Sequence, residues 1–221
     1  MHIKEIRIQS SRLQDLKRFY QSVLELRIES RGNSTFSISI GSSSFIIEET
    51  STGNPFYHFA INIPANKIEE ARSWLLNKVE LLWMEDYKSE IADFRNWHAK
   101  SIYFLDPVGN IVELIARFDL ANASEERFSS QQFLCISEIG LVFPENEIEE
   151  QVKKIIEESQ LTYFMKQPPM QHFKVLGDDE GLFIIVPENR NWYPTTKISR
   201  IYPLEITFES CRNSGSRVLR Y

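Results

Sequence analysis

The stretch Asp106-Pro107-Val108-Gly109-Asn110-Ile111-Val112-Glu113-Leu114-Ile115 carries the strongest fold signal in the chain. Proline presets φ, glycine accepts a positive φ, and Asp and Asn bind nearby backbone groups, so residues 106–110 predict a tight turn. The turn separates two strand-like runs, 101–105 and 111–115. Alternation places Glu113 on the opposite face of its strand from Val112 and Leu114. Because a carboxylate within an apolar strand is costly unless it faces water, a partner or a metal ion, Glu113 is a candidate functional residue.

The composition sets broad limits on what the chain can do. Its 221 residues suffice for one large domain, or for a domain with a smaller companion, and the 42% hydrophobic and 25% charged contents are those of a globular protein. The formal net charge is −6 and no basic tract occurs, so we expect no nucleic-acid partner. No long apolar run occurs, so we expect no membrane partner. The N-terminus lacks an apolar signal region, and Cys135 and Cys211 form no CxxC motif, which favours reduced thiols in the cytoplasm.

A strand-then-helix unit occurs three times along the chain. Strands are predicted at 5–9, 58–63 and 138–143, and the following helices begin near residues 13, 68 and 148. The helices carry apolar residues at i, i+3, i+4 and i+7, the pattern of a helix that lies on a sheet. Each helix precedes a short extended stretch (26–29, 81–84 and 161–165) and a hairpin (36–47, 101–115 and 172–186). The repeating unit is therefore βαβββ.

The repeats suggest a division of the chain into parts. We predict a domain of two modules over residues 1–118, a polar linker over 119–131, a third βαβββ module over 132–209 and a frayed tail over 210–221. The third module is degenerate, because aligning Gly181 with Gly109 puts Ile185 at the position of Glu113, although Glu138 repeats the position of Glu5. We expect no second complete metal site. The third module is expected to complete itself with a final strand near 202–208, or to pair with another subunit in a homodimer.

Together these features resemble the vicinal oxygen chelate superfamily, which includes glyoxalase I, extradiol dioxygenases and the fosfomycin- and bleomycin-resistance proteins. The resemblance rests on the βαβββ units, on Phe19-Tyr20 in the first helix, and on the Asp-Pro-x-Gly-Asn hairpin that ends in Glu113. It implies an α+β fold in which paired modules form a half-open mixed-sheet barrel, here followed by the third, degenerate module.

The resemblance also implies a metal site. In glyoxalase-like members two modules surround one divalent ion, and the matching positions here are Glu5, Glu48, His58 and Glu113. The implied cofactor is Mn, Fe, Ni, Zn or Mg. Glu113 and Glu5 would be the catalytic carboxylates that move a proton. Tyr103 stands where extradiol enzymes carry an acid/base tyrosine.

Several of these candidates have a simpler structural interpretation. Glu5 could pair with Arg7 on the same strand face, and Glu48 could be an edge-strand charge. For Tyr103 we favour packing with a hydrogen-bonded hydroxyl over catalysis. His98 is expected in a surface loop. The aromatic stretch 190–194 is expected to serve packing or an interface rather than to close over a ligand.

Three functions are compatible with the sequence. The leading one is a glyoxalase-like, divalent-metal-dependent enzyme of lyase or isomerase type that acts on a small oxygen-bearing molecule. The alternatives are a metal-free small-molecule binding protein of bleomycin-resistance type and an extradiol-type ring-cleaving dioxygenase. Converging carboxylates repel one another without a cation, which favours the metal. The dioxygenase chemistry prefers two His and one carboxylate, whereas only His58 occupies a matching position.

Overall fold

The computed structural model describes residues 1–210 and 213–221 and confirms the predicted α+β class. The first module contains β1 (His2–Ser10), α1 (Leu13–Arg18), the π-helical turn η1 (Phe19–Val23), β2 (Ile28–Ser30), β3 (Thr35–Ile40) and β4 (Ser43–Glu49). The second contains β5 (His58–Ile63), α2 (Ile68–Leu75), β6 (Ala92–Phe94), η2 (Arg95–Trp97), β7 (Ala99–Leu105) and β8 (Ile111–Arg117). After η3 (Ser130–Gln132), the third contains β9 (Cys135–Phe143), α3 (Ile148–Ser159), β10 (Lys174–Asp178) and β11 (Gly181–Pro187), and a final hairpin contains β12 (Leu204–Ser210) and β13 (Asn213–Arg220).

The turn at 106–110 forms as the sequence predicts. Gly109 has φ of +88°, and Asp106 Oδ1 accepts hydrogen bonds from the backbone N–H groups of Val108 and Asn110. The other carboxylate oxygen of Asp106 accepts from the hydroxyl of Tyr20, at 2.9 Å, so the turn is fastened to the first helix. This turn sets the β7–β8 register in which Tyr103 lies opposite Glu113.

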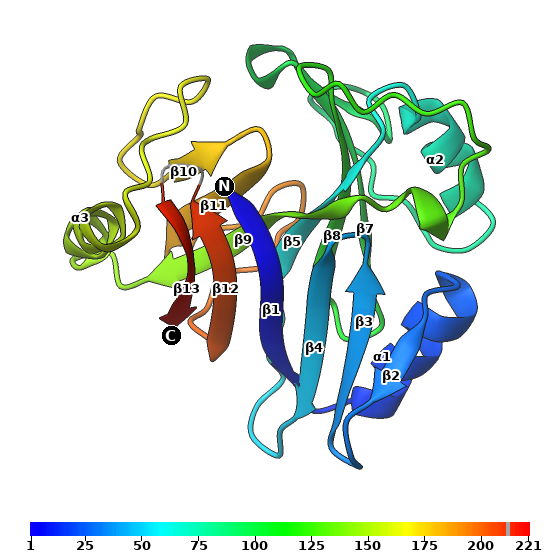
Figure 1. Ribbon diagram of the computed structural model, residues 1–221, viewed down its shortest axis with the longest axis horizontal. Coiled ribbons are helices and arrows are strands. Elements are labelled where there is room, and N and C mark those ends of the chain that lie inside the picture. The colour runs from blue at the N-terminus through cyan, green and yellow to red at the C-terminus, as the bar shows by residue number, and fades with distance from the viewer. Residues whose placement is uncertain (211–212) are drawn as a thin grey trace.

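The strands form two mixed sheets, but the modules pair differently from the expected arrangement (Figure 1). The six-stranded sheet has the order β13-β12-β1-β4-β3-β2, and the seven-stranded sheet has the order β10-β11-β9-β5-β8-β7-β6. We expected the first two modules to form one cup. Instead, β5 of the second module pairs antiparallel with β9 of the third, and these two modules form the half-barrel. The free edge of β1 is occupied by β12, which pairs antiparallel with it.

Several smaller expectations also need correction. The final strand does not complete the third module, because β12 joins β1 of the first. The described part of the predicted frayed tail forms β13, whose backbone hydrogen bonds to β12 hold it in place, while Cys211 lies outside the described residues. Of the three short extended stretches, the first overlaps the strand β2. The second forms only isolated bridges at Leu81 and Met84, and the third forms one at Tyr163.

One apolar core joins the two sheets and positions the site. It contains Ile6 and Ile8 of β1 together with Phe59 and Ile61 of β5, all nearly inaccessible to solvent. Because side chains alternate along a strand, burial of Phe59 and Ile61 in this core turns His58 toward the opposite face of the seven-stranded sheet. Within the described residues, no helix is both long and apolar enough to cross a membrane.

Candidate metal centre

The structure brings His58 and Glu113 together on two adjacent strands of the half-barrel. His58 begins β5 and Glu113 lies in the middle of β8, its parallel neighbour. His58 Nε2 lies 3.6 Å from Glu113 Oε2. His58 is only 6% exposed and Glu113 only 2% exposed, so both side chains are buried.

The third member of this group is Glu138 of β9, which is 3% exposed. One ligand atom each from His58, Glu113 and Glu138 lie within 4.8 Å of one another. The sequence showed that Glu138 repeats the position of Glu5, but it did not show that β9 would lie beside β5. That single pairing of strands brings Glu138 to the site.

The hydrogen bond of His58 prepares its imidazole for a ligand. Nδ1 lies 3.2 Å from the carbonyl oxygen of Ile111. Since a carbonyl only accepts hydrogen bonds, Nδ1 carries the proton and Nε2 presents its lone pair toward Glu113. Burial lowers the pKa of His58 to about 4, so the ring is neutral at physiological pH. A neutral imidazole with one nitrogen fixed by a backbone carbonyl is the form that binds metal ions.

The two carboxyl groups are held in an unfavourable environment. Burial, followed by the nearby charge of Glu138, raises the pKa of Glu113 to about 8. Burial also raises the pKa of Glu138, against the opposing effect of Arg117. Tyr103 lies opposite Glu113 in the β7–β8 register, and burial and the charge of Glu113 raise the pKa of its hydroxyl well above its ordinary value. Its packing among aromatic rings agrees with the structural interpretation, and its contact with Glu113 also places it in the site.

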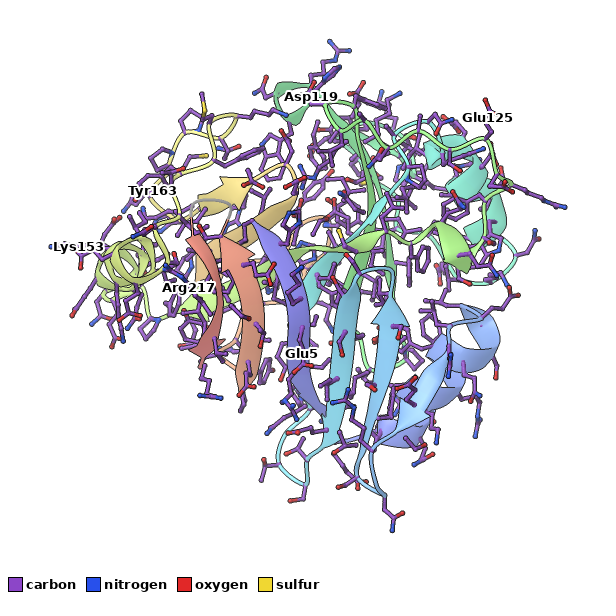
Figure 2. All side chains as sticks on the ribbon, viewed as in Figure 1. Glu5, Asp119, Glu125, Lys153, Tyr163 and Arg217 are labelled. Carbon is purple, nitrogen blue, oxygen red and sulfur yellow. The ribbon has the colours of Figure 1, made fainter. Side chains whose placement is uncertain are left out.

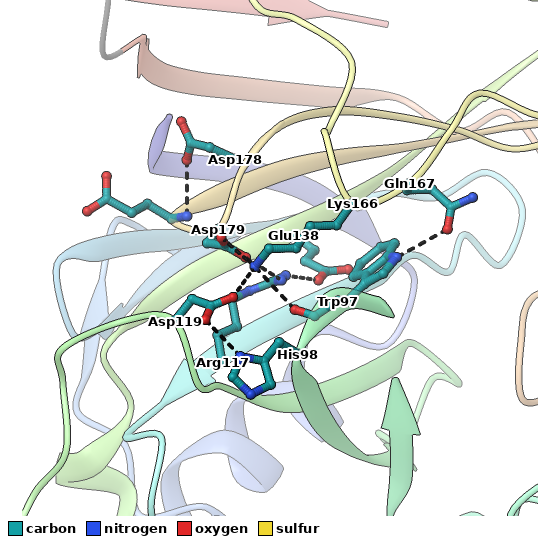
Figure 3. Close-up of polar contacts among 10 residues, drawn as sticks. Trp97, His98, Arg117, Asp119, Glu138, Lys166, Gln167, Asp178 and Asp179 are labelled. Atoms are coloured by element: carbon teal, nitrogen blue, oxygen red, sulfur yellow. Dashed lines mark hydrogen bonds and ion pairs between the residues drawn. The ribbon is translucent and has the colours of Figure 1, made fainter. Parts of the chain in front are cut away.

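A chain of charged groups connects this site to the surface (Figure 3). Arg117, with 0% exposure, forms a very short ion pair with Glu138, and its Nη1 lies 3.8 Å from Asp179. Lys166 bridges Asp179 and Asp119 at 2.7 and 2.6 Å. His98 lies in an exposed loop, as predicted, 2.7 Å from Asp119. Arg117 ends β8 and Asp119 follows it, whereas Lys166 and Asp179 belong to the third module, so these charged groups fasten the two modules together. None of these contacts was predicted from the sequence.

Glu5 and Glu48 do not join His58 and Glu113. Both lie on the six-stranded sheet. Glu5 belongs to β1, where it is labelled in Figure 2, and Glu48 belongs to β4. Arg7 lies 3.5 Å from Glu5, forms a very short hydrogen bond with Glu48 and lies 3.8 Å from Glu205 of β12. The four expected ligands therefore do not form one site, because β1 and β4 belong to a different sheet from β5 and β8. Arg7 is the counter-ion of Glu5 and Glu48.

An aromatic cavity of about 300 Å³ lies against the group formed by His58, Glu113 and Glu138. Besides His58, Glu113 and Glu138, it is lined by Tyr103, Phe94, Trp97, Gln167, Met170, Phe173, Ile184, Arg190, Trp192 and Tyr193. The stretch 190–194 was expected to serve packing or an interface, but its residues Arg190, Trp192 and Tyr193 form part of this wall. Aligning the glycines placed Ile185 at the position of Glu113, but the residue of β11 that faces the cavity is Ile184. The third module therefore contributes an apolar side chain from this strand.

Comparison with known proteins adds evidence for the fold. No protein-family model matches the sequence, and no curated protein matches it. Glyoxalase I from Zea mays aligns with a TM-score of 0.54 and 13% identity, over 90% of this chain and 70% of that chain. A candidate dioxygenase from Bacillus subtilis subsp. subtilis str. 168 aligns with a TM-score of 0.55 and 15% identity, over 84% of this chain and 63% of that chain. The chain has the vicinal oxygen chelate fold. At these identities the similarity describes the fold, while the chemistry depends on the side chains of this chain.

The residues that this fold brings together fit a divalent cation. Ligand atoms that share one ion at about 2.0–2.2 Å lie roughly 3–4 Å apart, so only a small contraction of the observed group is needed. One imidazole and two carboxylates form a donor set suited to Mn, Fe, Ni or Zn. Three protein ligands leave coordination positions for water or a substrate on the side of the cavity.

Proposed function

We propose that this protein is a divalent-metal-dependent enzyme of lyase or isomerase type that acts on a small oxygen-bearing molecule in the aromatic cavity. The observation that carries the proposal is the neutral His58 ring, whose Nε2 lone pair faces Glu113 beside a second buried carboxylate, Glu138. Such a group is costly in a protein interior unless a cation or protons compensate it. The proposed site belongs to the second and third modules, and a cytoplasmic location with Cys135 as a free thiol is part of the same proposal.

The residues divide into two roles. His58, Glu113 and Glu138 would hold the ion, which when bound would supply Lewis-acid stabilisation of negative charge on a substrate oxygen. Glu113 is the residue best placed to hold or move a proton, because it faces the cavity beside His58. Tyr103 lies opposite Glu113 and lines the cavity with it. Glu5 and Glu48 have no part in this proposal.

A metal-free binding protein is the second candidate, and one observation favours it. Arg117 neutralises Glu138 by direct contact, and a protonated Glu113 removes the remaining negative charge. The site is therefore electrically balanced without an ion. A ring-cleaving dioxygenase has less support, since its usual ligand set contains two His and one carboxylate, whereas this site contains one His and two Glu.

Metal content and thermal stability distinguish the two candidates. We expect protein purified without chelator to contain about one divalent ion per chain, and added Mn, Ni or Zn to raise the melting temperature of chelator-treated protein. His58→Ala should abolish both effects, because it removes the only nitrogen ligand. Glu5→Gln is the matched control and should behave as wild type. If wild type shows neither bound metal nor a metal-induced thermal shift, the metal-dependent function is wrong and the binding function remains.

A further inference from the structure

Arg190 is a half-buried cation in the wall of the aromatic cavity. It lies in the connection between β11 and β12, and its guanidinium carbon lies 5.2 Å from the ring centre of Phe173. This contact rests the planar guanidinium against an aromatic face, which limits its rotation. The guanidinium is thus a positioned group rather than a free surface charge.

Arg190 differs from the other charged groups of the cavity in having no counter-ion. Within the described part of the chain, no carboxylate oxygen lies within 4.0 Å of its guanidinium nitrogens. Glu138, in contrast, is paired with Arg117. Burial lowers the pKa of Arg190 with no opposing effect from an acid. A cation partly withdrawn from water without a partner is a cost that a bound anion would remove.

The surface around Arg190 selects for a flat, apolar body. The walls contain the rings of Phe94, Trp97, Phe173, Trp192 and Tyr193. Trp192 lies 5.2 Å from the His58 ring, and Tyr193 packs edge-on against Phe94 at 6.2 Å. The volume of about 300 Å³ is at the low end of that found for ligand pockets, so the cavity suits a small molecule of one or two rings.

We propose that the ligand of this cavity is a small aromatic carboxylate, whose ring lies between the aromatic walls and whose carboxylate binds the Arg190 guanidinium. The proposal rests on the cavity being the ligand site of the proposed function, and it names the chemical class of that ligand. Arg190 is the residue that determines specificity, because a planar guanidinium donates two parallel hydrogen bonds to a carboxylate and none of equal strength to a neutral amide.

The test compares two probes of nearly the same shape, 2-naphthoate, which carries a negative charge, and 2-naphthamide, which is neutral. Binding to the full-length protein is measured by isothermal titration calorimetry with chelator present, so that a carboxylate cannot bind through a metal ion. The variants are Arg190→Gln, which removes the charge, and Arg190→Lys, which keeps it without the planar fork. Arg95→Gln is the matched control, because Arg95 neighbours the cavity residue Phe94 but its side chain is 89% exposed. Melting curves verify that each variant is folded.

We expect wild type and Arg95→Gln to bind naphthoate at least about tenfold more tightly than naphthamide, as a charge-assisted pair in a partly buried site requires. Arg190→Gln should bind both probes equally, and Arg190→Lys should keep part of the preference. Equal binding of the probes to wild type, failure of both to bind, or a preference that survives Arg190→Gln overturns the proposal.

The same preparations are titrated with Mn to separate this result from the metal-dependent function. Metal binding without a carboxylate preference overturns the inference about Arg190 and leaves the metal site standing. A carboxylate preference without metal binding supports the inference about Arg190, while the metal-dependent function is then wrong.

Discussion

The stability of the metal-free protein should fall as the pH rises from 6.5 to 8, and Glu113 is the reason. Burial raises the pKa of Glu113 from 4.5 to about 8 in the folded protein. Between these two values the folded state holds a proton that the unfolded state has released. The contribution of Glu113 to stability is therefore fully present below pH 4.5 and is lost as the pH rises toward 8.

The contribution of His58 to stability has the opposite dependence on pH, and this limits the pH range in which the effect of Glu113 can be measured. Burial lowers its pKa from 6.5 to about 4, so its contribution is fully present above pH 6.5 and is lost as the pH falls toward 4. Between pH 4.5 and 6.5 a rise in pH lowers the stability contributed by Glu113 and raises that contributed by His58, so the two effects oppose each other. Above pH 6.5 the dependence of Glu113 remains, and Glu138, whose pKa burial also raises, acts in the same direction. At about 1.4 kcal/mol per pH unit for one proton, the remaining window of about 1.5 units corresponds to a loss of about 2 kcal/mol.

Urea unfolding followed by tryptophan fluorescence measures this loss. Wild type, Glu113→Gln and the control Glu5→Gln are compared at pH 6.5 and 8 with chelator present. Wild type and Glu5→Gln should lose about 2 kcal/mol of unfolding free energy, whereas Glu113→Gln should lose little, since it has no proton to release. With a saturating divalent metal the dependence should weaken or reverse, because metal binding requires an ionised carboxylate. A wild-type protein whose stability does not change over this range, or an undiminished loss in Glu113→Gln, refutes the reasoning.

Two further predictions concern the frame around the site. Arg117→Met should cost about 3–5 kcal/mol in urea unfolding, because it leaves Glu138 buried without its counter-ion. The double variant Arg117→Met/Glu138→Leu should recover most of that cost, and a single-variant cost below about 1 kcal/mol would contradict the importance of the pair. Gly41→Ala should cost about 3 kcal/mol, since a Cβ at this φ of +54° would lie 1.9 Å from the carbonyl oxygen of Leu134. Gly53→Ala, with φ of +68° and open space around it, is the control and should cost about 1 kcal/mol; equal costs in thermal or urea unfolding would show that the close contact is unimportant.

Local sequence rules determined the repeating units and two of the three residues of the candidate site, His58 and Glu113. The turn at Asp106, the positive φ of Gly109 and the alternation around Glu113 depend only on residues within a few positions. The same alternation turned His58 away from the apolar core, because Phe59 and Ile61 occupy the other face. These features were predictable because each is decided by backbone sterics or by the two-residue period of a strand.

Only the tertiary structure decided which modules share a sheet, and with it the rest of the site. The first strands of the three modules are similar alternating segments, so nothing local specifies that β5 pairs with β9 while β1 pairs with β12. That choice replaced Glu5 with Glu138 and brought Arg190 into the cavity wall. Strand pairing over long separations depends on the summed burial of whole faces and edges, a property of the assembled chain rather than of any short segment.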